Sequence, residues 1–364
     1  MKPRVIAFYL PQFHPFKEND EWWGKGFTEW TNVGKAKPLF KGHNQPRVPA
    51  DLGYYDLRLP IVREQQVELA REAGVTGFCY WHYWFGNGVQ LMNEIIDEVA
   101  ASGKPDFPFC LGWANESWKA KQWNKDGKGD RVLVEQKYGG EKDYRAHYEY
   151  VRTLITNKNY IRIDGKPFFL IYKPQDSPEI PKIIALWNKW IQEDKIADGF
   201  YFIANLDYQD QKDEYIAKGF SAITPAPLQR ENYKFKHHKR WIRGIIKGIQ
   251  ILKHKPTVFQ MSEANRHIPD INFDKAEDVI PFIIPQWDHS PRSGIKGYIV
   301  KSSPALFEQQ AEHMLSLVKE KRNQTILLKS WNEWAEGNYM EPDLTNGKGY
   351  INALRKAIDR VFNR

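Results

Sequence analysis

The strongest constraint on the fold of this chain is an alternation of short apolar runs with helical patterns along its 364 residues. Eight runs are rich in β-branched and aromatic residues, and most segments between them repeat apolar residues at helical spacing. Several runs are continuously apolar, which is typical of parallel strands covered on both faces. The predicted strands are 5–10, 75–81, 107–113, 167–172, 199–204, 220–224, 279–286 and 325–330. The predicted helices are 59–73, 91–101, 144–156, 181–193, 305–319 and 350–361, with a weaker one at 211–218.

This pattern predicts an α/β fold, a single (β/α)8 TIM barrel with enlarged loops at the C-terminal ends of the strands. The alternative is an open doubly wound sheet. A nucleotide-binding fold of that kind has a glycine-rich turn after its first strand, and this sequence has none there. No linker rich in Pro, Gly or Ser divides the chain, so residues 1–364 are expected to form one catalytic barrel.

The sequence contains no recognisable export or membrane segment. No stretch approaches the 18 or so consecutive apolar residues of a transmembrane helix. The apolar run 5–10 is shorter than the core of a signal peptide. The two cysteines, Cys79 and Cys110, are too few for a disulfide framework. We therefore expect two reduced thiols and a cytoplasmic protein.

The excess of positive charge is confined to one segment. The chain has 53 Lys and Arg against 45 Asp and Glu, a net charge of +8. Eight basic residues and no acidic residue lie between Asn232 and Ser262, so the other segments balance at 45 against 45. Nucleic acid is therefore not an expected partner, because its binding needs a broad basic surface. We expect a basic helical insertion at about 232–262. It either packs on the barrel with a solvated lysine face or contacts an anionic membrane or glycan.

Residues suited to sugar binding follow the predicted strands, where a TIM barrel carries its active site. Eleven of the 14 tryptophans lie there. Aromatic rings with a polar edge can stack on sugar rings, while the acidic, amide and imidazole groups between them bind hydroxyls. A cleft for several sugar units is predicted; an aromatic-rich core is the alternative. The predicted substrate-binding residues are His14, Trp22, Trp23, Glu29, Trp30, Trp81, His82, Tyr83, Trp84, Trp113, Asn115, Glu116, Trp118, Trp287, Asp288, Trp331, Asn332 and Trp334.

Glu333 and Glu336 are the predicted catalytic residues. Both follow the last predicted strand, and tryptophans flank Glu333. Burial and mutual repulsion would keep one carboxyl group protonated near neutral pH, which supplies the acid and the base of glycosidic cleavage. The hypothesis requires that both carboxylates face one open cleft and that neither is buried in a pair with Arg or Lys. Without a D-x-D pair, a P-loop, G-x-S-x-G or H-E-x-x-H, we expect no metal and no cofactor.

Five long runs resemble those of a known family: FYLPQFHPFKENDEWWGKGFTEWTNV from Phe8, FCYWHYWF from Phe78, FPFCLGWANESW from Phe107, PQWDHSPR from Pro285 and SWNEWAEGNYMEPD from Ser330. They are similar to those of the WbsX-like proteins, which are often named glycosyltransferases of surface-polysaccharide clusters. These proteins resemble the family 99 glycoside hydrolases, the endo-α-1,2-mannosidases. The resemblance covers nearly the whole chain and implies a (β/α)8 barrel.

The resemblance also implies roles for the two glutamates. Glu333 would act as a base on the 2-hydroxyl of the substrate and give a 1,2-anhydro sugar. Glu336 would be the general acid and then the base that activates water. The family's mannosidases commonly have His where this chain has Ala335, which puts mannose specificity in question.

We therefore expect a retaining, metal-independent, endo-acting glycoside hydrolase or transglycosylase whose partner is an α-linked, mannose-like oligo- or polysaccharide. A glycosyltransferase of O-antigen, capsule or other lipopolysaccharide biosynthesis is the alternative, because the expected cytoplasmic location suits biosynthesis. A non-catalytic glycan-binding barrel is the third reading.

Overall fold

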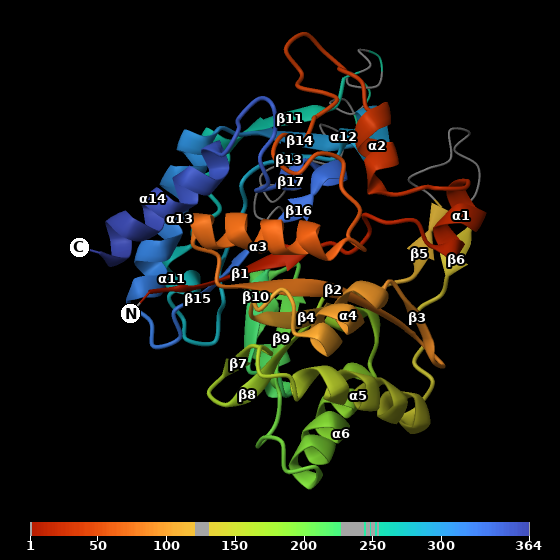
Figure 1. Ribbon diagram of the computed structural model, residues 1–364. Coiled ribbons are helices and arrows are strands. Elements are labelled where there is room, and N and C mark those ends of the chain that lie inside the picture. Colours follow the sequence, from red (N-terminus) through yellow and green to blue (C-terminus); the bar gives the residue numbers. More distant parts are fainter. Residues whose placement is uncertain are drawn as a thin grey trace. The chain divides into compact units, whose positions relative to one another are not determined.

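The computed structural model describes residues 2–120, 131–226 and 255–363, together with residues 244, 248 and 252. Its internal contacts divide into two compact units, and Figure 1 labels the helices and strands of both. The first unit draws on Met1–Val75, Ala226–Lys275 and Pro281–Arg364, and the second on Thr76–Pro225 and Ala276–Ile280.

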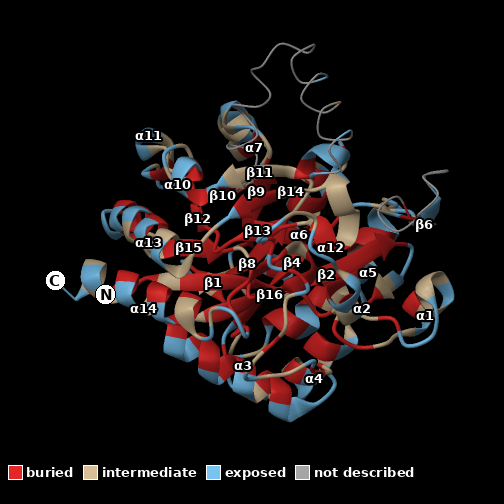
Figure 2. Ribbon diagram, turned by 90° about the horizontal axis from the view of Figure 1, so that it is seen from above, coloured by how far each residue is buried: buried red, intermediate tan, exposed pale blue. Residues whose placement is uncertain are grey.

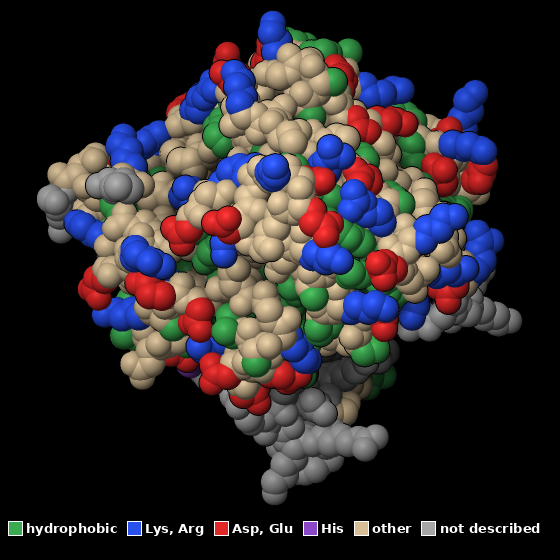
Figure 3. All heavy atoms as spheres, turned by 90° about the horizontal axis from the view of Figure 1, so that it is seen from below, with side chains coloured by type: hydrophobic (Ala, Val, Ile, Leu, Met, Phe, Trp, Pro, Cys, Tyr) green, Lys and Arg blue, Asp and Glu red, His purple; other side chains and the backbone are tan. Residues whose placement is uncertain are grey.

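The predicted basic helical insertion at 232–262 falls largely outside the described residues, as do Trp123 and Trp241. Residues 244, 248 and 252 are helical. The end of the predicted range is not one helix, because Thr257–Gln260 forms strand β11 and Met261–Ala264 forms the short helix α10. On the face shown in Figure 3, Lys and Arg side chains alternate with Asp and Glu, in keeping with the neutral balance outside the basic segment.

The second unit is built on five parallel strands in the order β10-β9-β8-β4-β2. All ten residues of β2 are buried, as expected of a strand covered on both faces. Ile223 of β10 forms a further parallel bridge to Val279, so residues 276–280 extend this edge of the sheet. The strands are β2 (Gly77–Gly86), β4 (Phe109–Trp113), β8 (Lys166–Ile171), β9 (Tyr201–Leu206) and β10 (Ala222–Pro225).

Amphipathic helices follow the strands of the second unit. On α6, Trp187 packs against Phe169 of β8, with ring centroids 5.0 Å apart, so the helix buries its aromatic face on the sheet. The helices are α4 (Glu94–Ser102), α5 (Glu141–Ile155), α6 (Ile180–Glu193) and α7 (Lys212–Ala217). The shorter elements are β3 (Val89–Leu91), β5 (Trp118–Lys119), β6 (Val132–Val134), β7 (Arg162–Ile163) and the 3-10 turns η2 (Pro174–Asp176) and η3 (Gln209–Gln211).

The first unit has three parallel strands in the order β1 (Arg4–Tyr9), β15 (Thr325–Leu328) and β12 (Phe282–Ile283). Three long helices lie side by side in this unit (Figure 1): α3 (Pro60–Ala73), α14 (Gly349–Phe362) and α13 (Pro304–Lys319). Gly74 ends α3 with φ +88°, and a Cβ there would lie 2.6 Å from Ile358 Cδ1. Glycine therefore lets α3 end against α14.

Short strands and helices of the first unit hold the loops that contain Glu333 and Glu336. Strand β14 pairs in parallel with β11 and antiparallel with β13, and β16 pairs antiparallel with β17. The bounds are α1 (Lys17–Trp23), α2 (Glu29–Lys35), α11 (Ile271–Asp274), β13 (Trp287–Asp288), α12 (Ser290–Ser293), η4 (Gly294–Lys296), β14 (Tyr298–Lys301), β16 (Asn332–Glu333), η5 (Trp334–Glu336) and β17 (Asn338–Tyr339).

The predicted α/β fold, a (β/α)8 barrel, is confirmed. In the described part of the chain, eight parallel strands lie in the two units, three in the first and five in the second, and each predicted strand or helix outside 232–262 has a counterpart. Residues 17–23 and 29–35, which were predicted as loop, are the helices α1 and α2. Thr28 begins α2 through a capping box with Thr31, a signal that the loop prediction missed. No helix within the described ranges has the length and apolarity to cross a membrane.

Candidate active site

The W-N-E-W-A-E-G run forms a tight hairpin after β15. Glu333 lies on β16, the 3-10 turn η5 carries Glu336, and β17 returns antiparallel. Gly337 makes this return possible because its φ is +55°, which favours glycine. It also lies against Asp288: a Cβ at Gly337 would be 2.6 Å from the Asp288 Cβ. The two glutamates are thereby held on one short loop.

Burial sets the electrostatics of Glu333. The residue is 5% exposed. Burial above all, and then the charge of Glu336 and a hydrogen bond with it, raise the pKa of Glu333 to about 7. The charges of Lys329 and Arg292 act in the opposite direction and are outweighed. Near neutral pH, Glu333 can therefore hold or release a proton, as a catalytic acid or base must.

Glu336 lies beside Arg292 and is 14% exposed at its side chain. The guanidinium of Arg292 donates to Glu336 and also contacts Glu29 Oε2, with Nη2 at 3.1 Å. The sequence hypothesis required that neither catalytic glutamate be held in a basic pair, and Glu336 does not meet that requirement here.

Glu29 is 1% exposed and its carboxylate binds Arg292. Its contact with sugar stays a prediction. Glu29 compensates the buried guanidinium.

Asp288 is likewise enclosed, at 1% exposed. It accepts hydrogen bonds from His43 and Gln45, each at 2.8 Å, and lies 3.8 Å from Arg47. Burial alone would raise its pKa, but the bond from His43, the charge of Arg47 and two further hydrogen bonds lower the pKa to about 2. Oδ2 accepts from His43 and Gln45, and Oδ1 accepts from the amide of Ser290; a contact with substrate stays a prediction.

A buried glutamate that the sequence did not single out anchors the hairpin. Glu341 is 2% exposed and accepts from Trp334 Nε1 at 2.6 Å, Gln66 Nε2 at 2.6 Å and Tyr55 Oη at 2.9 Å. Burial raises its pKa to about 7 against the opposing effect of these bonds. Trp334 also stacks on Tyr339, with centroids 3.8 Å apart. The Trp334 indole, which lies between the two glutamates in sequence, is thus held by Glu341 and Tyr339.

Most predicted sugar-stacking tryptophans are packed inside the protein. The strands β2 and β4, which carry three of them, are buried along their length (Figure 2). Trp113, Trp331 and Trp334 are 2%, 0% and 1% exposed and present no face to a ligand. Trp81, Trp84 and Trp287 are also buried, whereas Trp22, Trp23, Trp30 and Trp118 are partly exposed. The buried rings fit the alternative of an aromatic-rich core. Strand β2 continues to Gly86, and all of its aromatic residues are buried.

Several predicted polar contacts are also structural. Asn332 bonds to both the amide and the carbonyl of Leu10, at 2.7 and 3.0 Å, and Asn115 bonds to both groups of Lys173. His14 is fully buried.

In the second unit, His82 Nε2 lies 2.8 Å from His147 Nε2 inside an aromatic cluster, and burial lowers the pKa of His82 to about 3. Tyr83 is buried and Glu116 is exposed. His82 is therefore a core residue and not a sugar ligand.

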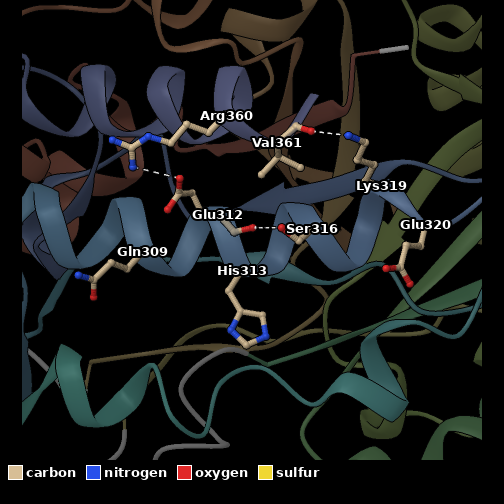
Figure 4. Close-up of a pocket in the computed structure, with 8 residues that line it drawn as sticks. All are labelled: Gln309, Glu312, His313, Ser316, Lys319, Glu320, Arg360 and Val361. Atoms are coloured by element: carbon tan, nitrogen blue, oxygen red, sulfur yellow. Dashed lines mark hydrogen bonds and ion pairs between the residues drawn. The ribbon is translucent and has the colours of Figure 1, made fainter. Parts of the chain in front are cut away.

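A surface hollow of about 650 Å³ lies between α13 and α14 (Figure 4). Its polar groups bond to one another: Arg360 Nη1 is 3.0 Å from Glu312, and Lys319 Nζ donates to the Val361 carbonyl at 2.6 Å. None of its lining residues is a predicted site residue. The residues lining it are Gln309, Glu312, His313, Ser316, Lys319, Glu320, Arg360 and Val361.

Arg292 and His289 are the site residues that sequence reasoning missed, although both lie in the run PQWDHSPR. The side chain of His289 is 16% exposed, with Nε2 3.9 Å from Glu336 Oε1. Burial, and next the charge of Arg292, lower its pKa to about 4, so the imidazole is neutral at pH 7. The signal available in the sequence was their place directly after the predicted strand 279–286. Among the described residues, no group of three or more His, Cys, Asp or Glu could hold a metal ion.

Comparison with known proteins gives a family and a fold. The profile of a family described as "Glycosyltransferase WbsX" matches residues 5–354. An uncharacterized protein named WxcX, from Xanthomonas campestris pv. campestris (strain B100), is 36% identical over 366 residues. A protein of the same name from a second strain of that pathovar is 35% identical over 364 residues. Each match covers 98% of this chain and 50% of the relative, so the chain spans about half the length of these relatives.

Solved structures share the fold at low identity. A "Glycoside hydrolase-like protein" has a TM-score of 0.60 at 14% identity, covering 98% of this chain and 94% of its own. The GH99 endo-alpha-mannosidase from Bacteroides thetaiotaomicron has a TM-score of 0.56 at 16% identity, covering 99% and 98%. These likenesses concern the fold alone.

Proposed function

Since this chain belongs to the WbsX glycosyltransferase family, we propose that it is a glycan-active enzyme that cleaves or transfers α-linked glycosidic bonds with Glu333 and Glu336. One observation carries the proposal: a buried glutamate with its pKa raised to about 7 is coupled to a second glutamate three residues further on. Such a pair can supply the acid and the base of glycosidic cleavage.

With its pKa raised to about 7, Glu333 carries a proton over part of the neutral pH range, while Arg292 donates a hydrogen bond to Glu336. The proposed reaction needs the other arrangement, with Glu333 ionised as a base on the sugar 2-hydroxyl and Glu336 protonated as the acid. A bound sugar whose 2-hydroxyl donates a hydrogen bond to the Glu333 carboxylate favours the ionised form of Glu333. It thereby moves the proton to Glu336, provided that Arg292 releases the carboxylate.

Retention of configuration, an endo-acting mode and a mannose-like α-linked polysaccharide are part of this proposal. Purified protein incubated with α-linked oligosaccharides should release shorter products, followed by mass spectrometry. Glu333→Gln and Glu336→Gln should both abolish release, while Glu320→Gln, an exposed glutamate outside the hairpin, should leave it unchanged. If cleavage persists in either catalytic variant, the proposed roles are wrong.

Glycosyl transfer in surface-polysaccharide biosynthesis is the second candidate, and the description of the family favours it. The same incubation with added nucleotide sugars separates the two. Products that grow only when a nucleotide sugar is present would establish transfer and overturn hydrolysis. Glycan binding without turnover, with both glutamates intact, would instead point to a non-catalytic barrel. A cytoplasmic location, proposed from the sequence, suits the biosynthetic setting.

A further inference from the structure

His289 has a fixed hydrogen-bonding arrangement that the proposed roles of the glutamates do not use. Its ring lies parallel to Trp287, with an interplanar angle of 18° and centroids 5.8 Å apart. On one side Nδ1 lies 2.7 Å from Ser293 Oγ, and on the other Nε2 lies 3.9 Å from Glu336 Oε1. The imidazole therefore stands between a hydroxyl group and a proposed catalytic carboxylate.

The contacts of Ser293 favour a proton on Nδ1. Ser293 Oγ lies 2.9 Å from the carbonyl oxygen of His289, which can only accept, and 2.7 Å from Nδ1. A hydroxyl that donates its one proton to the carbonyl accepts from Nδ1–H. In this tautomer, Nε2 of the neutral imidazole carries a lone pair on the side of Glu336.

Gly297 keeps the serine in place. A Cβ at this position would lie 2.4 Å from Ser293 Oγ and 3.3 Å from the backbone carbonyl of His289. The absence of a side chain at residue 297 thus makes room for the hydroxyl that favours this tautomer.

Nε2 and Glu336 Oε1 are 3.9 Å apart, beyond hydrogen-bond distance, while Arg292 donates to Glu336. We propose that His289 is a positioning residue for Glu336: its Nε2 lone pair accepts a hydrogen bond from the Glu336 carboxyl group whenever that group holds the proton. The bond would form after an approach of roughly 1 Å. Stabilising the protonated form raises the fraction of Glu336 that holds a proton before the reaction. The inference rests on the proposed function for its catalytic meaning, but the hydrogen bond itself does not.

Other charged groups act on this pair. Arg292 and Glu333 face Glu336, and Glu29 acts on it through Arg292. The charges that act on the pKa of His289 are those of Arg292, Asp288, Glu333 and Lys329. Burial above all, and next the charge of Arg292, lower the pKa of His289 to about 4 and keep the imidazole neutral at pH 7.

The test uses NMR of the full chain and needs no substrate. With ¹⁵N-labelled histidine, the His289 signals, identified by their loss in His289→Asn, should show Nδ1 protonated and Nε2 bare above pH 6. With ¹³C-labelled glutamate, the Glu336 signal, identified with Glu336→Gln, gives the titration midpoint of its carboxyl group. His289→Asn keeps an amide near Nδ1 but has no atom at Nε2, so the Glu336 midpoint should fall by about 0.7 pH unit. His289→Gln, which reaches the Nε2 position with an acceptor, should restore it.

Ser293→Ala provides an independent arm that keeps the imidazole. Without the hydroxyl, the ring can protonate Nε2 and donate to the ionised Glu336, so the midpoint should again fall. A protonated Nε2 in the native protein, or an unchanged Glu336 midpoint in both His289→Asn and Ser293→Ala, would overturn the proposal. Where glycan turnover is measurable, the basic limb of its pH profile should move with the midpoint. Absence of turnover would count against the proposed function alone.

Discussion

Replacing Glu333 with glutamine should stabilise the protein at high pH. Burial, the charge of Glu336 and their hydrogen bond raise the pKa of Glu333 from 4.5 to about 7. Between these values the unfolded chain has lost the proton and the native protein retains it, so stability falls as the pH rises. One pKa unit corresponds to 1.36 kcal/mol, and from pH 5 to pH 8 the native protein loses about 2.5 kcal/mol. Glutamine does not ionise and avoids that loss.

Urea unfolding of Glu333→Gln and the native protein, followed by tryptophan fluorescence at pH 5 and pH 8, measures the effect. The variant should gain about 2.5 kcal/mol on the native protein between the two pH values. Glu341, whose pKa is also raised, is present in both proteins, so its contribution cancels. Glu320→Gln, on the exposed surface, serves as the control and should show no pH-dependent difference. An equal difference at both pH values would refute the argument that Glu333 holds the proton in the native state.

Three further substitutions test the scaffold of the site by chemical unfolding. Glu341→Gln places an amide against three hydrogen-bond donors and should lower the free energy of unfolding by about 1–3 kcal/mol; no loss would contradict the anchoring role. Gly337→Ala forces an alanine to φ +55° against Asp288 and should cost more than about 1 kcal/mol. Arg292→Gln leaves the Glu29 carboxylate buried without its guanidinium partner, so it should cost about 3 kcal/mol. An unchanged free energy of unfolding would argue against that charge pairing.

The periodicity of the chain was enough to predict the fold class, because buried parallel strands and amphipathic helices need distinct repeats of apolar residues. The catalytic pair was predicted from its position after the last strand, and its assignment stays a prediction. The aromatic residues were harder to interpret. A tryptophan near the end of a strand can face a ligand or the core, and sequence spacing does not distinguish the two. Trp113 and Trp331 turned out to be core residues.

By itself, the sequence determined the α/β alternation, the order of the elements and the placement of Glu333 and Glu336 on one loop, since all of these are local in the chain. Only the tertiary structure decided the electrostatic surroundings of that pair. Arg292 is 44 residues from Glu336 and 263 from Glu29 along the chain, yet contacts both, and burial raises the pKa of Glu333 to about 7. Electrostatic energies depend on distance in space and on exclusion of water, which local sequence patterns do not encode.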